Sequence, residues 1–141
     1  MDLLKRLFGG NNTAPQIGDL DDGGVYVGLS ESDGKPLHAA LADLPEYKTF
    51  EEALAAAEQL KAEHSTAHVP TPDELDVNLY QNRNKGELKR TFSTWRGFPD
   101  SRYLSSEPYY GIVPLVKAQN FNDGTKDFSF MDTSLPVRLV W

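Results

Sequence analysis

Two helix starts, each marked by a capping box, lie in the middle of a chain whose two ends carry strand patterns. Thr49 lies three residues before Glu52, and the same spacing begins at Thr71; at this spacing side chains and backbone amides cap each other. Apolar residues then recur at helical intervals, which predicts helices over residues 50–63 and 72–83. Because strands and helices are segregated along the chain, the order predicts an α+β fold and argues against a parallel βαβ sheet.

Short runs of apolar and β-branched residues predict strands on both sides of the helices. These runs are residues 25–29, 36–39, 111–118, 127–131 and 137–141. Asn122-Asp123-Gly124 is a hairpin-turn signal between two of them, and the last run alternates so that it should bury one face. We expect the N-terminal hairpin and the last strands to form one twisted antiparallel sheet with two helices packed on it. A long irregular loop region is expected over residues 87–108.

The chain of 141 residues has the length of one ordinary domain, and 39% of its residues are hydrophobic, enough to build a core. We expect residues 24–141 to form this domain, and residues 1–23 to be a short amphipathic segment followed by a polar linker. The apolar side chains within Leu3–Phe8 share one helical face. This face is expected to pack on the domain or a partner; peripheral membrane contact is the alternative, although only two basic residues accompany it.

Composition excludes several classes of function. The chain has no cysteine, which removes disulfides, thiolate metal sites and thiol chemistry. Its net charge of −7 would repel a polyanion over most of the surface, so general nucleic-acid binding is not expected. No apolar run approaches the ~18 residues of a membrane-spanning helix, and no signal-peptide pattern is present. We therefore expect a cytoplasmic protein, or one delivered within a phage or secretion assembly.

Patterns that support catalysis or metal binding are incomplete. His64 and His68 have the spacing of two ligands on one helix face, but they lie at a helix end and lack the glutamate of a catalytic zinc motif. Residues 19–24 resemble the start of a calcium loop, yet Ser30 stands where a bidentate glutamate is needed. The chain contains no nucleophile elbow, phosphate loop or dinucleotide motif. We expect no enzyme activity, metal or cofactor.

Five short motifs follow one another in a fixed order. They are Tyr26–Leu37, Val69–Leu75, Tyr103–Glu107, Phe121–Gly124 and Val137–Val140. In this order they resemble the Lcl C-terminal domain family, bacterial and phage domains of unknown function with a C-type-lectin-like fold. The resemblance covers about residues 24–141 and implies a binding role without general catalytic activity. Two aromatic residues of the family pattern are replaced, one within Thr66-Ala67-His68 and one at Leu104.

One segment has a charge opposite to that of the whole chain. Residues 83–102 carry a net charge of +4, with aromatic residues among the cations. Arginine and aromatic residues together are typical of protein interfaces, although aromatic side chains in such a segment can also fold inward as core. We expect a recognition patch made by Arg90, Trp95, Arg96, Phe98 and Arg102, with Tyr109 and Tyr110 at its edge.

These patterns favour a non-catalytic recognition module that binds a protein or a glycan through the long-loop region. The alternative is a phage- or prophage-type acidic inhibitor of a host nucleic-acid-processing or defence complex. It arises because residues 1–82 carry a net charge of −10, and acidic decoys occupy basic clefts. Binding to such a complex would depend strongly on salt, whereas glycan or apolar protein binding would not.

Overall fold

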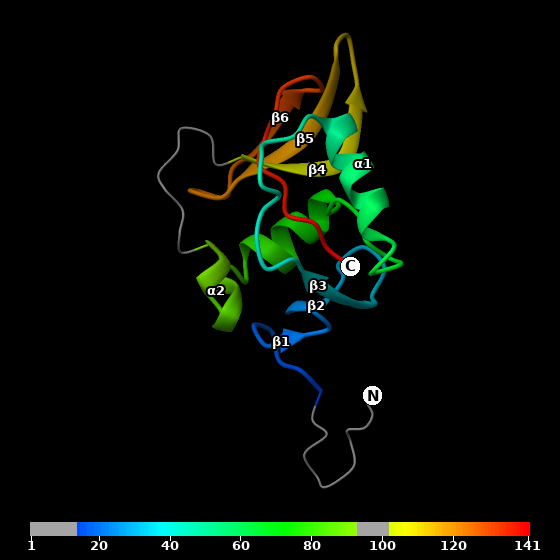
Figure 1. The fold of residues 1–141 in the computed structure, drawn as a ribbon. Helices are drawn as coiled ribbons and strands as arrows, with labels where there is room; N and C mark the ends of the chain where they lie inside the picture. The colour runs from blue at the N-terminus through cyan, green and yellow to red at the C-terminus, as the bar shows by residue number, and fades with distance from the viewer. Residues whose placement is uncertain (1–13, 93–101) are drawn as a thin grey trace, which may run out of the picture.

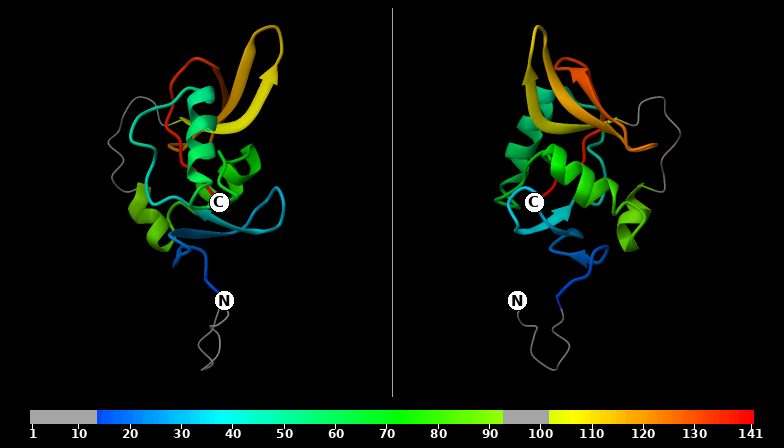
Figure 2. Two further views of the ribbon diagram at one scale, coloured as in Figure 1. Left: turned by 45° about the vertical axis from the view of Figure 1, so that its right-hand side comes forward. Right: turned by 180° about the vertical axis from the view of Figure 1, so that it is seen from behind.

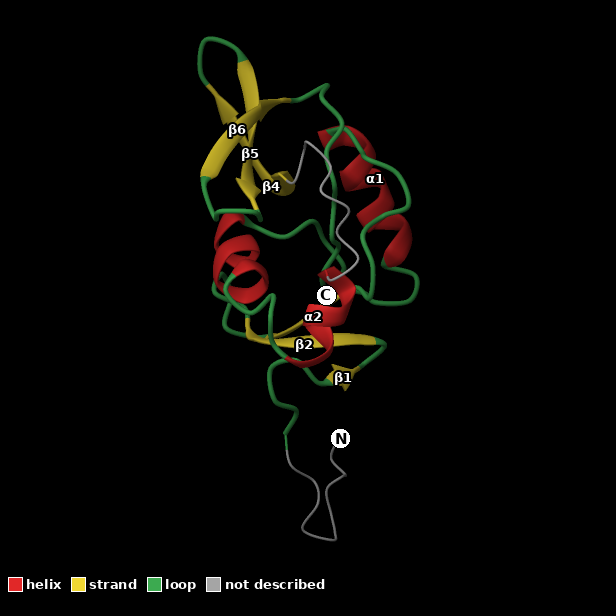
Figure 3. Ribbon diagram, turned by 90° about the vertical axis from the view of Figure 1, so that its left-hand side faces the viewer, coloured by secondary structure: helices red, strands yellow, loops and turns green. Residues whose placement is uncertain are grey.

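The computed structural model describes residues 14–92 and 102–141, and within them two small antiparallel sheets lie at opposite ends of the molecule (Figure 1). The first sheet contains β1 (Leu20–Asp21), β2 (Gly24–Leu29) and β3 (Pro36–Ala39). The second contains β4 (Arg102–Tyr110), β5 (Pro114–Asn120) and β6 (Lys126–Phe130). The helices are α1 (Phe50–Leu60), η1 (Glu74–Tyr80) and α2 (Gly86–Phe92) (Figure 3). The predicted α+β class is confirmed, but the single sheet is wrong.

Both predicted capping boxes are present. Thr49 Oγ1 accepts a hydrogen bond from Glu52 N at 3.3 Å, and Glu52 Oε1 accepts one from Thr49 N at 3.0 Å. Thr71 and Glu74 make the same pair of bonds, at 3.1 and 3.0 Å. Helix α1 ends at Leu60, three residues before the predicted end, and residues 61–63 continue as a turn.

The helix that follows the second box differs from its prediction. It begins at Pro72, as predicted, but its main part, η1, is wound as a π-helix and ends at Tyr80. Asn78 in η1 donates to the carbonyls of Val27 and Leu29 at 2.8 and 2.9 Å, next to the bulge in β2. The wider helix thus brings a side-chain amide to carbonyl oxygens that the irregular strand pair leaves available.

The irregular region predicted over residues 87–108 is wrong for most of its length. Helix α2 and most of β4 occupy its described parts, and residues 93–101 lie outside the described residues. Leu88 in α2 and Leu104 in β4 are fully buried, so packing against the two cores stabilises these elements without a strong local pattern. At the other end of the chain, β1 lies inside the predicted polar linker and pairs with β2, so the predicted boundary at residue 24 falls within a hairpin.

The C-terminal segment Leu135–Trp141 runs between the two sheets (Figure 1). Ala40 N donates to Leu139 O at 2.9 Å on one side, and Val140 N donates to His68 O at 3.1 Å on the other. All seven residues are buried. The prediction that this segment buries one face is therefore wrong, because loops and strands cover both of its faces.

Candidate functional site

The predicted recognition patch does not form one surface among the described residues. Three of its seven residues lie outside the described part of the chain: Trp95, Arg96 and Phe98. Arg90 lies on α2 and Arg102 begins β4, whereas Tyr109 and Tyr110 end the same strand. At about 3.3 Å per residue, β4 places Tyr110 roughly 25 Å from Arg102. The structure thus places the four described residues of the patch on two separate surfaces.

The first surface surrounds a cavity between α2, the start of β4 and the β5–β6 turn, which we call the basic pocket. It has a volume of about 230 Å³ and is lined by Arg83, Asn84, Lys89, Phe92, Tyr103, Phe121 and Asn122. Two cations and two side-chain amides therefore meet three aromatic rings, and no carboxylate is among these described lining residues. The pocket offers positive charge above an apolar floor.

The floor of the basic pocket is held in place from below. The rings of Tyr103 and Phe121 lie 4.5 Å apart between centroids, and Phe92 packs edge-on to Tyr103 at 5.8 Å. The guanidinium of the buried Arg138 lies 4.2 Å from the Phe92 ring, and Tyr103 donates a hydrogen bond to Asp43 Oδ2 at 2.7 Å. Buried interactions thus fix Phe92 and Phe121, the two partly exposed rings that a ligand or partner would meet, while the Tyr103 ring, 1% exposed, supports them.

The cations around the basic pocket differ in how they are held. Arg83 donates to Tyr80 O at 2.7 Å and lies over the Tyr80 ring at 3.9 Å, so its guanidinium is positioned by its own helix end. Arg90 Nε is 3.2 Å from Glu87 with 81% of its side chain exposed, and Arg102 Nη1 is 3.8 Å from Asp127. Arg90 and Arg102 are therefore partly neutralised, whereas the pocket itself combines its cations with aromatic rings.

The second surface is apolar. In this part of the chain, the sequence analysis named only Tyr109 and Tyr110 as candidate site residues. This surface covers the outer side of the second sheet and the loop at the end of the β4–β5 hairpin, which extends beyond the rest of the molecule (Figure 2). We call it the apolar face and define it by its exposed members: Tyr109, Ile112, Val113, Phe128 and Phe130. Tyr110 is exposed on the opposite side of the same strand. The sequence predicts a strand over residues 127–131, close to β6, but not that the side chains of Phe128 and Phe130 are exposed.

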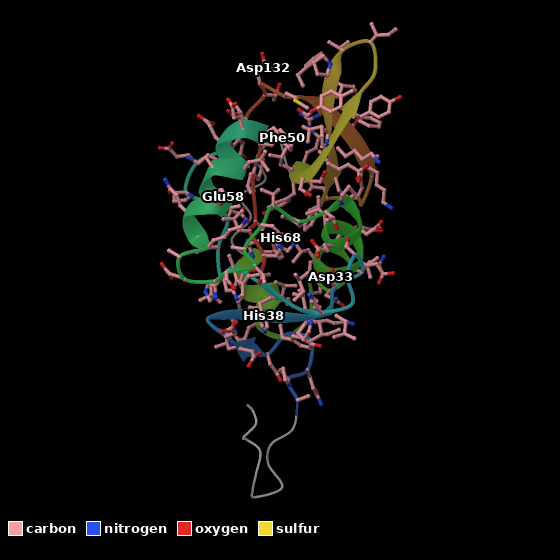
Figure 4. The ribbon with its side chains drawn as sticks, turned by 90° about the vertical axis from the view of Figure 1, so that its right-hand side faces the viewer. Asp33, His38, Phe50, Glu58, His68 and Asp132 are labelled. Atoms are coloured by element: carbon pink, nitrogen blue, oxygen red, sulfur yellow. The ribbon has the colours of Figure 1, made fainter. Side chains whose placement is uncertain are left out.

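The two histidines considered as zinc ligands have separate partners. His64 stacks on Trp141 with 3.8 Å between ring centroids, whereas the partly exposed His68 lies between the two sheets with Nε2 2.8 Å from Oε1 of the buried Glu74 (Figure 4). Asp21, from the calcium-like segment, pairs with His38 at 2.8 Å. Across residues 14–92 and 102–141, no three His, Asp or Glu side chains gather closely enough to hold a metal ion.

Glu74 is a buried carboxylate with a complete set of donors. Burial alone would raise its pKa, but hydrogen bonds from His68, Ser30 and the Thr71 amide outweigh burial and hold the pKa of Glu74 below its usual value. Burial alone would lower the pKa of His68, but Glu74 and the Thr66 carbonyl outweigh it and raise the pKa. The pair is therefore charged over a wider pH range than either group alone, and it joins β2 to η1 through Ser30.

We expect this pair to contribute most to the free energy of unfolding between about pH 4.5 and pH 6.5. As pH falls below 4.5 and passes the lowered pKa of Glu74, the carboxylate is protonated and its contribution to stability is lost. As pH rises above 6.5 and passes the raised pKa of His68, the imidazolium loses its proton and its contribution is lost. Urea unfolding of the wild type and His68→Gln should differ most within this window. A difference that does not change with pH would contradict the assignment.

A scan against models of known protein families finds none that matches this chain, and a search of curated proteins finds no significant match. Within the described residues, no helix is both long and apolar enough to cross a lipid bilayer. Function is therefore inferred from the geometry of the described residues.

Proposed function

We propose that the chain is a non-catalytic recognition module that binds a protein partner through the basic pocket beside α2. The observation that carries the proposal is the combination of Arg83 and Lys89 with three aromatic rings, on a chain whose net charge is −7. Arginine and aromatic side chains are enriched in transient protein interfaces. The complementary partner presents an acidic side chain beside a flat apolar group, so that the carboxylate meets the cations and the apolar group meets the rings.

The sequence resemblance to the Lcl C-terminal domain family supports the same class of function. As part of the proposal, the chain has a C-type-lectin-like fold, in which the chain end closes on an early strand. The hydrogen bond from His38 N in β3 to Trp141 O, at 2.7 Å, is consistent with such a closure. A location in the cytoplasm, or delivery within a phage or secretion assembly, belongs to the same proposal.

The acidic-inhibitor alternative is supported by a different surface. Helix α1 carries exposed glutamates and no basic residue, and one more exposed glutamate follows it. These residues are Glu51, Glu52, Glu58 and Glu63. Lys61 pairs with Glu58 at 2.7 Å and Glu52 accepts the capping bond from Thr49 N, which leaves Glu51 and Glu63 as the exposed carboxylates most accessible to a basic cleft. An inhibitor of this kind would bind through α1 rather than through the basic pocket.

Charge reversal in the basic pocket tests the proposal. Lys89 is exposed on α2, so Lys89→Glu should leave the fold intact but weaken partner binding by about tenfold or more. Lys35→Glu changes an equally exposed lysine in the β2–β3 turn and serves as the matched control. Cross-linking from host lysate, followed by mass spectrometry, should recover a partner with the wild type and the control but not with Lys89→Glu.

Two outcomes would contradict the proposed site. A partner that binds Lys89→Glu as tightly as the wild type places the interface elsewhere. A partner that is lost on Glu51→Gln combined with Glu58→Gln, and whose affinity falls steeply with salt, supports the acidic surface of α1 instead. A glycan that binds the wild type but not Lys89→Glu would show that the basic pocket is the site and that its ligand is a glycan rather than a protein.

A further inference from the structure

We propose that the groove between η1 and the second sheet, here called the η1 groove, binds a small neutral molecule with a flat ring and an N–H beside a carbonyl group. Uracil-type nucleobases and lactams have an edge of this kind. The groove shares no lining residue with the basic pocket, so the inference does not depend on the proposed function.

The η1 groove has the size of a small-molecule site. Its volume is about 320 Å³, at the lower end of the ~300–1,000 Å³ that is typical of such sites. One wall lies at the start of η1, which is the helix without a label below the second sheet in Figure 3, and Pro72 and Leu75 make this wall apolar. The other wall is one side of the sheet. Residues that pair directly across β5 and β6 share a side, and two such pairs line the groove: Lys117 with Phe128, and Gln119 with Lys126.

Gln119 supplies a hydrogen-bond acceptor that has no partner. The residue is 2% exposed, and its Nε2 donates to Asp76 Oδ1 at 2.9 Å and to Gly124 O at 3.1 Å. These two bonds use both amide hydrogens and hold the amide plane in place. Within residues 14–92 and 102–141, Gln119 Oε1 is the only buried side-chain nitrogen or oxygen atom without a hydrogen-bond partner. Because buried acceptors are normally paired, this atom points to a ligand with an N–H donor.

Ser105 supplies a donor on the same wall of the groove. It is fully buried, and its Oγ accepts a hydrogen bond from Glu107 N at 3.2 Å, which leaves the hydroxyl hydrogen without an acceptor among the described residues. A ligand edge that both donates and accepts would satisfy Gln119 and Ser105 together. A cyclic amide has its N–H and C=O on the same side, whereas the two groups of a trans peptide bond point in opposite directions.

The lysines of the η1 groove already have charge partners. Lys117 Nζ lies 2.5 Å from Glu107 Oε2, and Lys126 Nζ lies 3.2 Å from Asp76 Oδ2. An anionic ligand would have to displace one of these carboxylates, and a cationic ligand would meet two ammonium groups. Asp73 also lines the groove but is exposed to solvent, where its charge is screened. The groove therefore favours an uncharged ligand.

Phe128 supplies an exposed aromatic ring beside these polar groups. The residue is 44% exposed, and its ring lies 5.2 Å from that of Tyr109 between centroids. Lys117, which pairs with Phe128, is two residues before Gln119 on β5, so the ring and the unpaired acceptor are neighbours on one side of the sheet. A flat ligand ring can therefore stack on Phe128 with its edge towards Gln119. Phe128 belongs both to the apolar face and to the η1 groove.

Uridine and its N3-methyl derivative are the matched ligands that test this proposal. Uridine carries the N–H between two carbonyl groups, whereas 3-methyluridine has the same ring, sugar and charge but lacks this donor. NMR titration of the full chain should give a Kd below about 1 mM for uridine and binding about tenfold weaker, or less, for 3-methyluridine. Uridine 5′-monophosphate should bind no more tightly than uridine, because its phosphate would meet lysines that are already paired.

Phe128→Ala and Phe130→Ala are the matched variants. Both residues are exposed on β6, at 44% and 58%, but Phe128 lines the η1 groove and Phe130 does not. Phe128→Ala should weaken uridine binding by about tenfold or more, because the stacking ring is removed. Phe130→Ala should bind uridine as tightly as the wild type does. The circular dichroism of both variants should match that of the wild type.

Three results would overturn the proposal. A spectrum that does not change with about 10 mM uridine would mean that the η1 groove holds water only. Equal affinities for uridine and 3-methyluridine would mean that Gln119 Oε1 does not recognise the ligand. An equal loss of affinity in Phe128→Ala and Phe130→Ala would place the bound ligand outside the η1 groove.

Discussion

Replacing Asp43 by alanine should destabilise the protein by about 3–5 kcal/mol, because it leaves the buried Arg138 without its charge partner. The Arg138 side chain is 1% exposed, and its Nε and Nη2 lie 2.9 and 2.8 Å from Asp43 Oδ1. Asp43 also accepts the hydroxyl of Tyr103 at 2.7 Å. Burial, together with Asp43, raises the pKa of Tyr103 above its usual value, so the hydroxyl stays a donor. One substitution therefore breaks two buried interactions.

Urea unfolding measures this loss of stability directly, and Glu46→Ala provides the control. Glu46 is exposed in the same loop, so its removal should change the free energy of unfolding by no more than about 0.5 kcal/mol. A loss for Asp43→Ala as small as that of the control would mean that water or another acceptor replaces the carboxylate. The same variant should also loosen the floor of the basic pocket, because Arg138 and Tyr103 support Phe92.

Deleting Val137–Trp141 should unfold the domain. All five residues are buried, and removing an apolar side chain from the core costs about 1.5–3 kcal/mol each. Four such side chains together reach the ~5–15 kcal/mol that is the whole stability of an ordinary domain. The deletion also removes the backbone bonds that join β3 to the segment around His68. Near-ultraviolet circular dichroism should lose its native signal, and unfolding should lose cooperativity.

Trp141→Phe is the control for the deletion. It keeps an aromatic ring against His64 and removes only the indole donor to Asp22 O, a bond of 3.2 Å. We expect this variant to fold, with a loss of about 1 kcal/mol. A truncated chain that unfolds cooperatively near the wild-type midpoint would show that the two sheets hold together without the C-terminal segment.

The basic pocket could be predicted only in part from the sequence. The charge of residues 83–102 indicated a basic surface, and Arg83 and Lys89 do meet in a pocket. However, the pocket also requires Phe121 and Asn122 from the β5–β6 turn, which the sequence marked only as a hairpin turn. Residues more than thirty positions apart meet through packing, and one chain read alone contains no signal for such a contact. For the same reason, the sequence does not show that Tyr109 and Tyr110 lie at the opposite end of β4 from Arg102.

Local elements whose stabilising groups are neighbours in the chain could be predicted from the residues alone. Thr49 and Thr71 start helices because a hydroxyl three residues before a glutamate satisfies free backbone amides wherever the segment lies. Asn122–Gly124 turns the chain between β5 and β6 because Gly124 adopts a φ of +82° that other residues avoid.

Features whose interacting residues are distant in the chain depend on tertiary packing and could not be predicted in this way. Two separate sheets form because the C-terminal segment lies between them and takes hydrogen bonds from both sides. Gly24 illustrates the dependence: a side chain there would collide with Ala39 O and with the ring of Trp141, which is 117 residues away in sequence. Arg138 is buried because Asp43, Thr91 and Ala40 O surround it. Contacts between residues distant in sequence, rather than local sequence patterns, therefore determine the burial of Arg138 and the position of the basic pocket and the apolar face.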